Sequence, residues 1–477
     1  MIRMPIQDIA AATGAGVLVD AGAPVDGDVV IDSRKAAPGA LFVAFPGERV
    51  DGNDYLAAAV EAGCAAVVAS REPSEGLLAL AAERGCSVLR AQGDDCEELM
   101  LRLAHAWRRL HPDWVVLAVT GSVGKTTTKE MLAAAASSQR RCHATRGNLN
   151  NLIGLPLTLM SAPEDSEVVV CELGMNHPGE IERLSRCCEP TLACVTNVGT
   201  SHIGILGSRE NIARAKAEVV CGMRDHGELS RLLVMPSSCD FAGFVADGFA
   251  RPAGVAVQTV GSRPGDVACA REVSVGADGC ASLLLCFDDG WQRRITLGVP
   301  GAKVVDDLLL AMTLAWRLGL DRDAACDAVC AMRATSMRLD VRTAPSGARV
   351  IDDTYNAAPA SMASSLDVLA SLPCEGRRIA VLGEMGELGE QAERLHGYVG
   401  AYAAARVDLL VLVGGALAAQ MGEAARTMGL SDDAVESFAT VADAARVMGP
   451  VLGEGDVVLV KASRAAGLDE FVRSVLS

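Results

Sequence analysis

Residues 115–128 contain the pattern on which the chemistry of this chain depends. An apolar run from Val115 to Val119 predicts a buried strand, which leads into Thr120-Gly-Ser-Val-Gly-Lys-Thr-Thr and then into a helical pattern. Glycines between a strand and a helix allow successive backbone N–H groups to turn towards an anion, and the N-terminus of the helix adds positive potential. The pattern therefore predicts a loop that binds the phosphates of a nucleotide.

Each position of this loop has an expected role. The backbone N–H groups would face the phosphate oxygens, the ammonium group of Lys125 would add a point charge, and the hydroxyl of Thr126 would be a magnesium ligand. The strict Walker pattern has a glycine where this chain has Val119, so the loop fits the shorter pattern T-G-x-x-G-K-T. The residues predicted to contact the nucleotide are Gly121, Ser122, Val123, Gly124, Lys125, Thr126 and Thr127.

Further polar residues follow other predicted strands. A second apolar run ends in Glu172, and a third leads to His202. Ser208 is the predicted N-cap of a helix that carries Lys216. Because ligands gather at the carboxyl ends of parallel strands, we expect Glu172 and His202 to lie beside the phosphate loop, with the acid holding magnesium.

Two loops contain residues suited to a polar substrate. Asn148, Asn150 and Asn151 fall within four residues, and a loop so rich in amides can hydrogen-bond a ligand in several directions. Nearer the N-terminus, Ser33 and Arg34 lie at the end of a strand predicted over residues 29–35. Their hydroxyl and guanidinium groups would suit a phosphate or the edge of a uracil.

The chain of 477 residues is long enough for three domains of ordinary size. We predict an N-terminal α/β domain at 1–113, a central parallel-sheet domain with the phosphate loop at 114–332, and a C-terminal Rossmann-like, doubly wound domain at 333–477. Apolar runs separated by alanine-rich helical segments place the fold in the α/β class.

Composition excludes several classes of protein. Sixty acidic and 43 basic residues give a net charge of −17, which argues against a nucleic acid as partner. The longest apolar run, Leu409–Ala419, is shorter than the ~20 residues of a spanning helix, so we expect no membrane span. The sixteen cysteines include no C-x-x-C pair, and the N-terminus lacks a signal-peptide pattern. We therefore expect reduced thiols and a cytoplasmic location.

Motifs along most of the chain resemble those of the Mur ligase family of peptidoglycan synthesis. They are the phosphate loop, Asn148-x-Asn-Asn-x-x-Gly-x-Pro-Leu-Thr, Glu172-Leu-Gly-Met-Asn-His-Pro-Gly-Glu-Ile, the surroundings of His202 and Lys216-x-Glu, Asp353-Thr-Tyr-Asn-Ala-Ala-Pro-Ala-Ser-Met, Gly383-Glu-Met-Gly-Glu-Leu-Gly, Asp32-Ser-Arg and Lys461-Ala-Ser-Arg. The segments at Asn176 and Met385 favour the branch of the family that adds D-alanyl-D-alanine.

The resemblance implies an ATP-dependent ligase that requires Mg²⁺ and has three domains, which bind a UDP sugar, ATP and an incoming dipeptide in chain order. Its substrates would be UDP-N-acetylmuramoyl-tripeptide and D-alanyl-D-alanine. The terminal carboxylate of the peptide would first be converted to an acyl phosphate, which the amine of the dipeptide would then attack. Such an enzyme would serve cell-wall biogenesis in the cytoplasm, and we expect it to be a monomer.

The resemblance also assigns roles to individual residues, with Lys216 carbamoylated by CO₂ to bind a second magnesium ion. The implied catalytic residues are Lys125, Lys216, His202 and Arg338. The implied magnesium ligands are Thr126, Glu172, His202 and Lys216. The implied ATP contacts beyond the phosphate loop are Asp307, Arg338, Asp353 and Asn356. The implied substrate contacts are Ser33, Arg34, Asn148, Asn150 and Asn151.

The chain departs from the family pattern at several positions. Lys303 stands where a histidine is common, and Asp307 stands where an asparagine is expected to hydrogen-bond the adenine. An ionised aspartate accepts hydrogen bonds but donates none. Gly204 replaces a common glutamate, and Met337 replaces a glycine.

Two other functions stay open at this point. One is a different amide ligase of the same superfamily, such as the enzyme that adds the third residue of the peptide or a folylpolyglutamate synthetase. The third-residue ligase usually carries Asp-Asn-Pro-Arg in its last domain, and this chain does not. The other is a nucleotide-binding regulator that has lost turnover, which Lys303 and Asp307 would favour.

Overall fold

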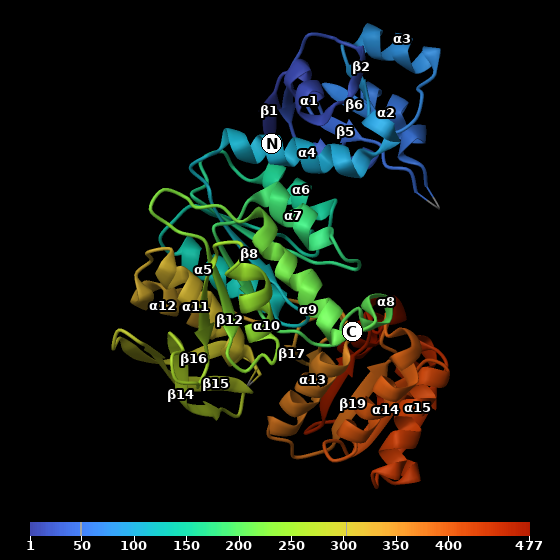
Figure 1. Ribbon diagram of the computed structural model, residues 1–477. Helices are drawn as coiled ribbons and strands as arrows, with labels where there is room; N and C mark the ends of the chain where they lie inside the picture. Colours follow the sequence, from blue (N-terminus) through green and yellow to red (C-terminus); the bar gives the residue numbers. More distant parts are fainter. Residues whose placement is uncertain (48–49, 302) are drawn as a thin grey trace.

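The computed structural model describes residues 1–47, 50–301 and 303–477. Its strands form three large sheets that follow one another along the chain, together with a small two-stranded one. Helices pack on these sheets, so the α/β class predicted from the sequence is confirmed. Figure 1 shows the N-terminal, middle and C-terminal parts in chain order, with the long helix α4 (Cys96–Leu110) between the first two.

The N-terminal part contains a five-stranded sheet with the order β2-β7-β6-β5-β4, in which β2 is antiparallel to β7 and the other pairs are parallel. Strands β1 and β3 form the separate antiparallel pair. The elements before α4 are β1 (Ile2–Met4), α1 (Ile6–Thr13), β2 (Gly16–Val19), β3 (Val25–Gly27), β4 (Val29–Val30), β5 (Leu41–Val43), α2 (Leu56–Glu61), β6 (Ala66–Ala69), α3 (Glu75–Arg84) and β7 (Ser87–Arg90).

One predicted strand in this part is shorter than expected. The strand that begins at Val29 ends at Val30 instead of continuing to Lys35. The side chain of Asp32 accepts a hydrogen bond from the N–H group of Arg34 at 3.0 Å. This local bond turns the chain into a short 3-10 helix, Ser33–Lys35.

The middle part contains a nine-stranded sheet with the order β16-β15-β14-β13-β12-β11-β8-β10-β9. Strands β8 to β14 pair in parallel, whereas β15 and β16 extend the sheet antiparallel. These two antiparallel strands were not predicted from the sequence. Its elements are β8 (Val115–Thr120), α5 (Lys125–Ser137), β9 (Cys142–Ala144), α6 (Gly154–Ser161), β10 (Val168–Glu172), α7 (Glu180–Cys188), β11 (Leu192–Val195), α8 (Ile203–Leu206), α9 (Arg209–Ala217), β12 (Leu232–Pro236), α10 (Ala242–Val245), β13 (Ala256–Val260), β14 (Ala268–Val275), β15 (Cys280–Phe287), β16 (Gln292–Pro300), α11 (Val304–Arg317) and α12 (Arg322–Cys330).

The C-terminal part contains a six-stranded sheet with the order β17-β18-β22-β19-β20-β21, which is parallel except for β17. Its elements are β17 (Asp340–Thr343), β18 (Arg349–Asp352), α13 (Pro359–Ser371), β19 (Arg378–Gly383), α14 (Ala392–Ala403), β20 (Leu409–Val413), α15 (Ala416–Thr427), β21 (Val435–Phe438), α16 (Val441–Met448), β22 (Val457–Lys461) and α17 (Asp469–Leu476).

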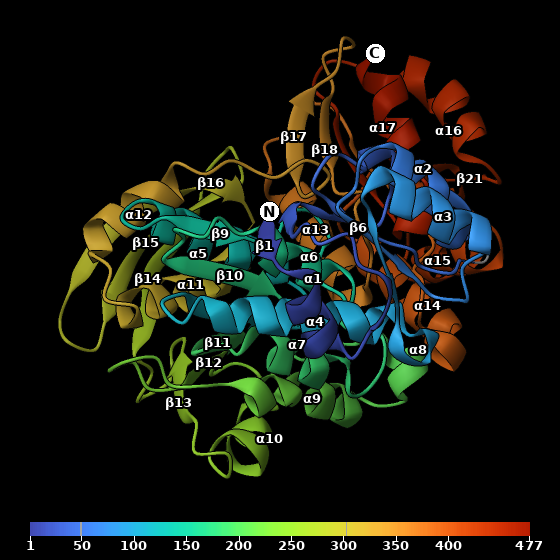
Figure 2. The ribbon, with the colours of Figure 1, turned by 90° about the horizontal axis from the view of Figure 1, so that it is seen from above.

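The register of the middle sheet brings three strand ends together. Glu172 at the end of β10 is paired with Val119 of β8, and Val195 at the end of β11 is paired with Thr120. These central strands are almost entirely buried, as parallel strands covered on both faces are. In Figures 1 and 2, α8 beyond this edge lies against the C-terminal part of the chain. Among the described helices, none is both long and apolar enough to cross a membrane.

Candidate active site

The phosphate loop connects β8 to α5, and its two glycines are required by the surrounding atoms. Gly124 has a φ of 89°, and a Cβ added there would lie 2.3 Å from Oδ1 of Asp307. A Cβ added at Gly121 would lie 1.8 Å from Oγ1 of Thr196. The ammonium group of Lys125 donates a hydrogen bond to the carbonyl oxygen of Gly121 at 2.9 Å. The loop is thus held in a compact turn at the N-terminus of α5, where backbone N–H groups can bind an anion.

A buried carboxylate lies directly beside this loop. Glu172 is 2% exposed, and its two carboxylate oxygens accept hydrogen bonds from the hydroxyl of Thr126 and the amide of Asn150, each at 2.8 Å. Both donors are neutral, so these contacts orient the carboxylate without neutralising its charge. A buried charge in this state favours a bound cation. The hydroxyl and carboxylate oxygens are also the donor types that Mg²⁺ prefers, usually together with phosphate oxygens and water.

Two lysines line the same cleft with unusual electrostatics. Lys216 is 2% exposed, and its pKa lies well below the ordinary value because burial removes the hydration of the ammonium group, with the charge of Lys125 adding to the effect. The pKa of Lys125 is also lowered by loss of hydration, and the charge of Arg338 adds to this while Glu172 opposes it. The side chain of Lys216 is therefore favoured as a neutral amine, which is the form that reacts with CO₂.

His202 occupies the loop between β11 and α8, with a positive φ of 63°. Its Nδ1 lies 2.6 Å from Oε2 of Glu387, a residue of the C-terminal part, and this contact lowers the pKa of the Glu387 carboxyl. Over residues 1–47, 50–301 and 303–477, no three His, Cys, Asp or Glu side chains are grouped closely enough to hold a metal ion. Protein groups alone thus do not form a complete metal site around Glu172 and His202.

The residues predicted on the C-terminal side of the cleft are held in place by a buried ion pair. Nζ of Lys461, at the end of β22, lies 2.5 Å from Oδ2 of Asp353 and donates a hydrogen bond to the carbonyl oxygen of Asn356 at 2.9 Å. The sequence indicates Lys461 only as part of a motif, without a role. The guanidinium group of Arg338 lies 3.9 Å from the centre of the Tyr355 ring, a cation–π contact that keeps it at the edge of the cleft.

Asp307 is buried beside the phosphate loop. It is 9% exposed, accepts a hydrogen bond from the hydroxyl of Thr128 at 3.0 Å and packs under Gly124. Burial raises its pKa well above the usual value, so the carboxyl group is favoured in its protonated form. A protonated carboxyl can donate as well as accept, whereas an ionised one only accepts, and the contact of Asp307 with the adenine stays a prediction.

Most predicted site residues line one cleft of about 1100 Å³ between the middle and C-terminal parts. They are Ser122, Val123, Gly124, Lys125, Thr126, Thr127, Asn148, Asn150, Asn151, Glu172, His202, Lys216, Asp307, Arg338, Asp353 and Asn356. Gly121, Ser33 and Arg34 are not among the lining residues, and Ser33 and Arg34 are also separated from the loop along the chain. They lie on the N-terminal part, where the guanidinium group of Arg34 pairs with Asp32 at 2.7 Å.

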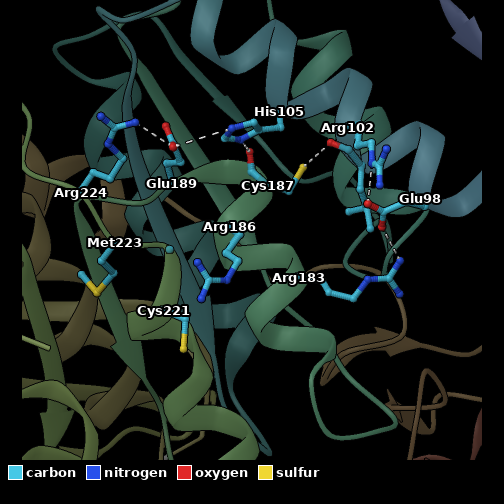
Figure 3. A pocket seen from close by; sticks show the side chains of 12 residues that line it. Glu98, Arg102, His105, Arg183, Arg186, Cys187, Glu189, Cys221, Met223 and Arg224 are labelled. Atoms are coloured by element: carbon cyan, nitrogen blue, oxygen red, sulfur yellow. Dashed lines mark hydrogen bonds and ion pairs between the residues drawn. The ribbon is translucent and has the colours of Figure 1, made fainter. Parts of the chain in front are cut away.

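A second cleft, of about 590 Å³, lies where α4 meets α7 and the segment that follows α9 (Figure 3). Four arginines line it, and each is paired with a carboxylate, as in the contacts of Arg183 with Glu98 at 3.2 Å and of Arg224 with Glu189 at 2.8 Å. No residue predicted to act in catalysis lines this cleft. The larger cleft at the phosphate loop is therefore the candidate active site.

Comparisons with known proteins agree with the motifs. Three family models match the chain: "Mur ligase family, catalytic domain" at residues 28–93, "Mur ligase middle domain" at 119–315, and "Mur ligase, glutamate ligase domain" at 337–464. A UDP-N-acetylmuramoyl-tripeptide--D-alanyl-D-alanine ligase from Bacillus subtilis (strain 168) is 32% identical over 456 residues, which cover 94% of this chain and 93% of the relative. The ligase of the same name from Mycobacterium tuberculosis is 35% identical over 507 residues, with coverages of 98% and 96%.

Solved structures give the same result. A crystal structure of MurF from Acinetobacter baumannii is 27% identical and covers 100% of this chain and 99% of its own, with a TM-score of 0.85. The MurF ligase from Thermotoga maritima in complex with ADP, at 24% identity, shares the fold with a TM-score of 0.77 and coverages of 94% and 96%.

Proposed function

Because the chain belongs to the Mur ligase family, we propose that it is an ATP-dependent ligase that joins D-alanyl-D-alanine to UDP-N-acetylmuramoyl-tripeptide in the synthesis of peptidoglycan precursors. The observation that carries this proposal is the buried Glu172, whose hydrogen-bond donors are both neutral, beside the phosphate loop in a cleft that the C-terminal part shares. The relatives matched over nearly their whole length support the choice of substrates.

We propose ATP and Mg²⁺ as the cofactors of this cleft. Residues 121–127 would surround the phosphates, and Thr126 and Glu172 would hold the metal, with His202 and a modified Lys216 as further ligands. A carboxylate and a triphosphate repel each other, and the bound metal would reduce this repulsion. Lys125 and Arg338 would place positive charge beside the phosphoryl group that moves, while Asp307, Asp353 and Asn356 would lie along the nucleotide.

The burial of Lys216 supports the carbamoylation that the family resemblance implies. The neutral amine would attack CO₂, form an N–C bond and release a proton, which gives a carbamate. This converts a potential cation into an anion with two oxygens, suited to a hard metal such as magnesium. Lys216 would thus become a metal ligand only after modification.

In the proposed reaction, the terminal carboxylate of the tripeptide attacks the γ-phosphate of ATP, so that an acyl phosphate forms and ADP leaves. The neutral amine of D-alanyl-D-alanine then attacks the acyl carbon, and inorganic phosphate leaves. Asn148, Asn150 and Asn151 would orient the substrate in front of the phosphate loop, and the bond of Asn150 to Glu172 supports this placement. Ser33 and Arg34 would contact the UDP end on the N-terminal part.

We propose the same division of the chain as from the sequence: 1–113 for the UDP sugar, 114–332 for ATP and 333–477 for the dipeptide. The three separate sheets support this division. We also propose that the protein acts in the cytoplasm as a monomer. All sixteen cysteines are free, which supports a reducing compartment. Light scattering in solution would test the oligomeric state.

The deciding experiment is an acceptor panel. The protein, ATP, Mg²⁺ and UDP-N-acetylmuramoyl-tripeptide are incubated with equal concentrations of D-alanyl-D-alanine, lysine, diaminopimelate or glutamate, and amide product is measured. We expect product with the dipeptide and little or none with the free amino acids. Preference for a single amino acid would overturn the proposed substrates in favour of another ligase of the superfamily, and absence of product with every acceptor would favour a nucleotide-binding regulator.

A further inference from the structure

A contact between the middle and C-terminal parts is formed by His202 and Glu387 together with the adjoining backbone. Nδ1 of His202 lies 2.6 Å from Oε2 of Glu387. The N–H group of Gly204 donates a hydrogen bond to the carbonyl oxygen of the same glutamate at 3.0 Å. His202 and Gly204 belong to the start of α8, and Glu387 belongs to the loop after β19. The side chain and the backbone of one residue thus both contact the segment that presents His202.

Two facing glycines allow this contact. A Cβ added at Gly204 would lie 2.4 Å from the backbone nitrogen of Gly389, and a Cβ added at Gly389 would lie 2.7 Å from Cα of Gly204. Both distances are shorter than real Cβ contacts permit, and the nearest atoms belong to the backbone, which cannot rotate away. The short distance between the two docked segments therefore requires glycine at both positions. This short distance also allows the Glu387 carboxylate to reach the imidazole of His202.

We propose that Glu387 is a positioning residue for His202, delivered by the C-terminal part when it docks on α8. The proposal rests on the proposed function, in which His202 is a metal ligand. An imidazole binds a metal through one nitrogen, and a carboxylate at the other nitrogen fixes the tautomer and the orientation of the ring. Oε2 of Glu387 lies 2.6 Å from Nδ1, although the ring N–H is not aligned as a hydrogen bond to it. A carboxylate at this distance would favour the proton on Nδ1 and leave the lone pair of Nε2 for a metal.

The consequence is a coupling between docking and metal binding. His202 lies on the middle part, but the group that orients it belongs to the C-terminal part, so the ring is oriented by the carboxylate only in the docked arrangement. Coupling between two equilibria is reciprocal, so a metal bound at His202 stabilises the docked arrangement in turn. Glu387 thereby links the position of the C-terminal part to the site at which the phosphates bind.

The test uses Mn²⁺ as a probe for the metal sites of the full-length protein with a non-hydrolysable ATP analogue, with free Mn²⁺ followed by electron paramagnetic resonance. We expect Glu387→Ala to weaken Mn²⁺ binding at one site by about 10- to 100-fold, as loss of a carboxylate behind a metal-bound histidine does. Glu387→Gln should recover part of the affinity because its amide oxygen still accepts from Nδ1–H. Glu390→Ala, at an exposed glutamate three residues away, is the matched control and should bind normally.

His202→Ala provides the reference for the same site. The double variant with Glu387→Ala should bind Mn²⁺ no more weakly than His202→Ala alone, because a positioning residue has no effect without the ring it orients. Normal Mn²⁺ affinity in a folded Glu387→Ala variant, or additive losses in the double variant, would overturn the proposal.

Gly204→Ala tests whether docking delivers the carboxylate. The atoms nearest to the added methyl group are backbone atoms of Gly389, Leu388 and Glu387 and do not include the carboxylate. The variant should nevertheless weaken Mn²⁺ binding as Glu387→Ala does and enlarge the radius of gyration in small-angle X-ray scattering. Gly243→Ala is the control, since Gly243 also lies in a short helix and its added Cβ would meet no atom within 4 Å. Normal binding and an unchanged radius for Gly204→Ala would refute delivery by docking. These readouts do not involve the acceptor, so failure of the acceptor panel and failure of this proposal are separate results.

Discussion

The buried ion pair between Lys461 and Asp353 predicts a large loss of stability in one variant. Lys461 is 3% exposed and Asp353 is 9% exposed, with 2.5 Å between Nζ and Oδ2. The hydroxyl of Ser365 also donates to the same carboxylate oxygen, at 2.6 Å. In Lys461→Met the apolar stem is retained and the charge is lost, so the carboxylate remains buried without a cation. Removal of one partner of a buried pair costs about 3–5 kcal/mol.

This cost can be measured as a thermal shift. For a unit of about 150 residues, 1 kcal/mol corresponds to roughly 2–4 °C, so the unfolding transition of the C-terminal part should fall by about 10 °C. Differential scanning calorimetry of the full-length protein would follow Lys461→Met, Asp353→Asn and the double variant. The double variant should be more stable than the sum of the single losses predicts, because it leaves no unpaired charge.

The matched control is Arg446→Met, which removes the cation of an exposed pair with Asp443 and should leave the melting temperature unchanged. Two results would refute the reasoning. One is a Lys461→Met variant whose transition lies within about 2 °C of the parent, which corresponds to less than about 1 kcal/mol. The other is strict additivity in the double variant, which would mean that the two groups do not stabilise each other.

Three further predictions concern the phosphate side of the cleft. Lys125→Ala should fold normally by circular dichroism but lose at least about 100-fold in phosphate release, because its charge is needed as the phosphoryl group moves; near-normal release would remove the loop from the mechanism. Lys216→Ala should be nearly inactive and partly rescued by acetate, whereas Lys216→Arg should not be rescued, and an unmodified lysine in a crystal structure of the parent would count against carbamoylation. Burial raises the pKa of Asp307, so the folded chain keeps a proton that the unfolded chain releases above about pH 4, and the contribution to stability falls as the pH rises. Asp307→Asn should therefore reduce the decline in melting temperature between pH 5 and pH 8, and an identical decline in parent and variant would contradict the assigned protonation.

The phosphate loop could be predicted from sequence because its geometry is local. Gly121 and Gly124 are separated by two residues, and the strand and helix on either side fix the direction of the loop. The position of Glu172 also followed from sequence, since parallel strands align their carboxyl ends at one edge of a sheet. Both inferences need only the rules of a single sheet.

Other features depend on contacts between distant segments. The contact of His202 with Glu387 joins two different parts of the chain, and no pattern around either residue indicates the other. The raised pKa of Asp307 results from its burial next to Gly124, which the helical pattern around it does not reveal. The strands β15 and β16 could not be predicted in the same way because their antiparallel pairing departs from the alternation of parallel strands and helices.

The separate sheets have a mechanical consequence. In the described parts of the chain, no strand belongs to more than one sheet. All backbone hydrogen bonds between the strands of a sheet therefore lie within the N-terminal, the middle or the C-terminal part, and each part can be treated as one body. Such a body can rotate as a rigid unit while the hydrogen bonds between its strands stay intact. Only the contacts between bodies must then break and re-form. At α8 the backbones of Gly204 and Gly389 approach each other directly, with no side chain between them. Large movements of the C-terminal part are therefore compatible with a phosphate loop whose atoms hardly shift.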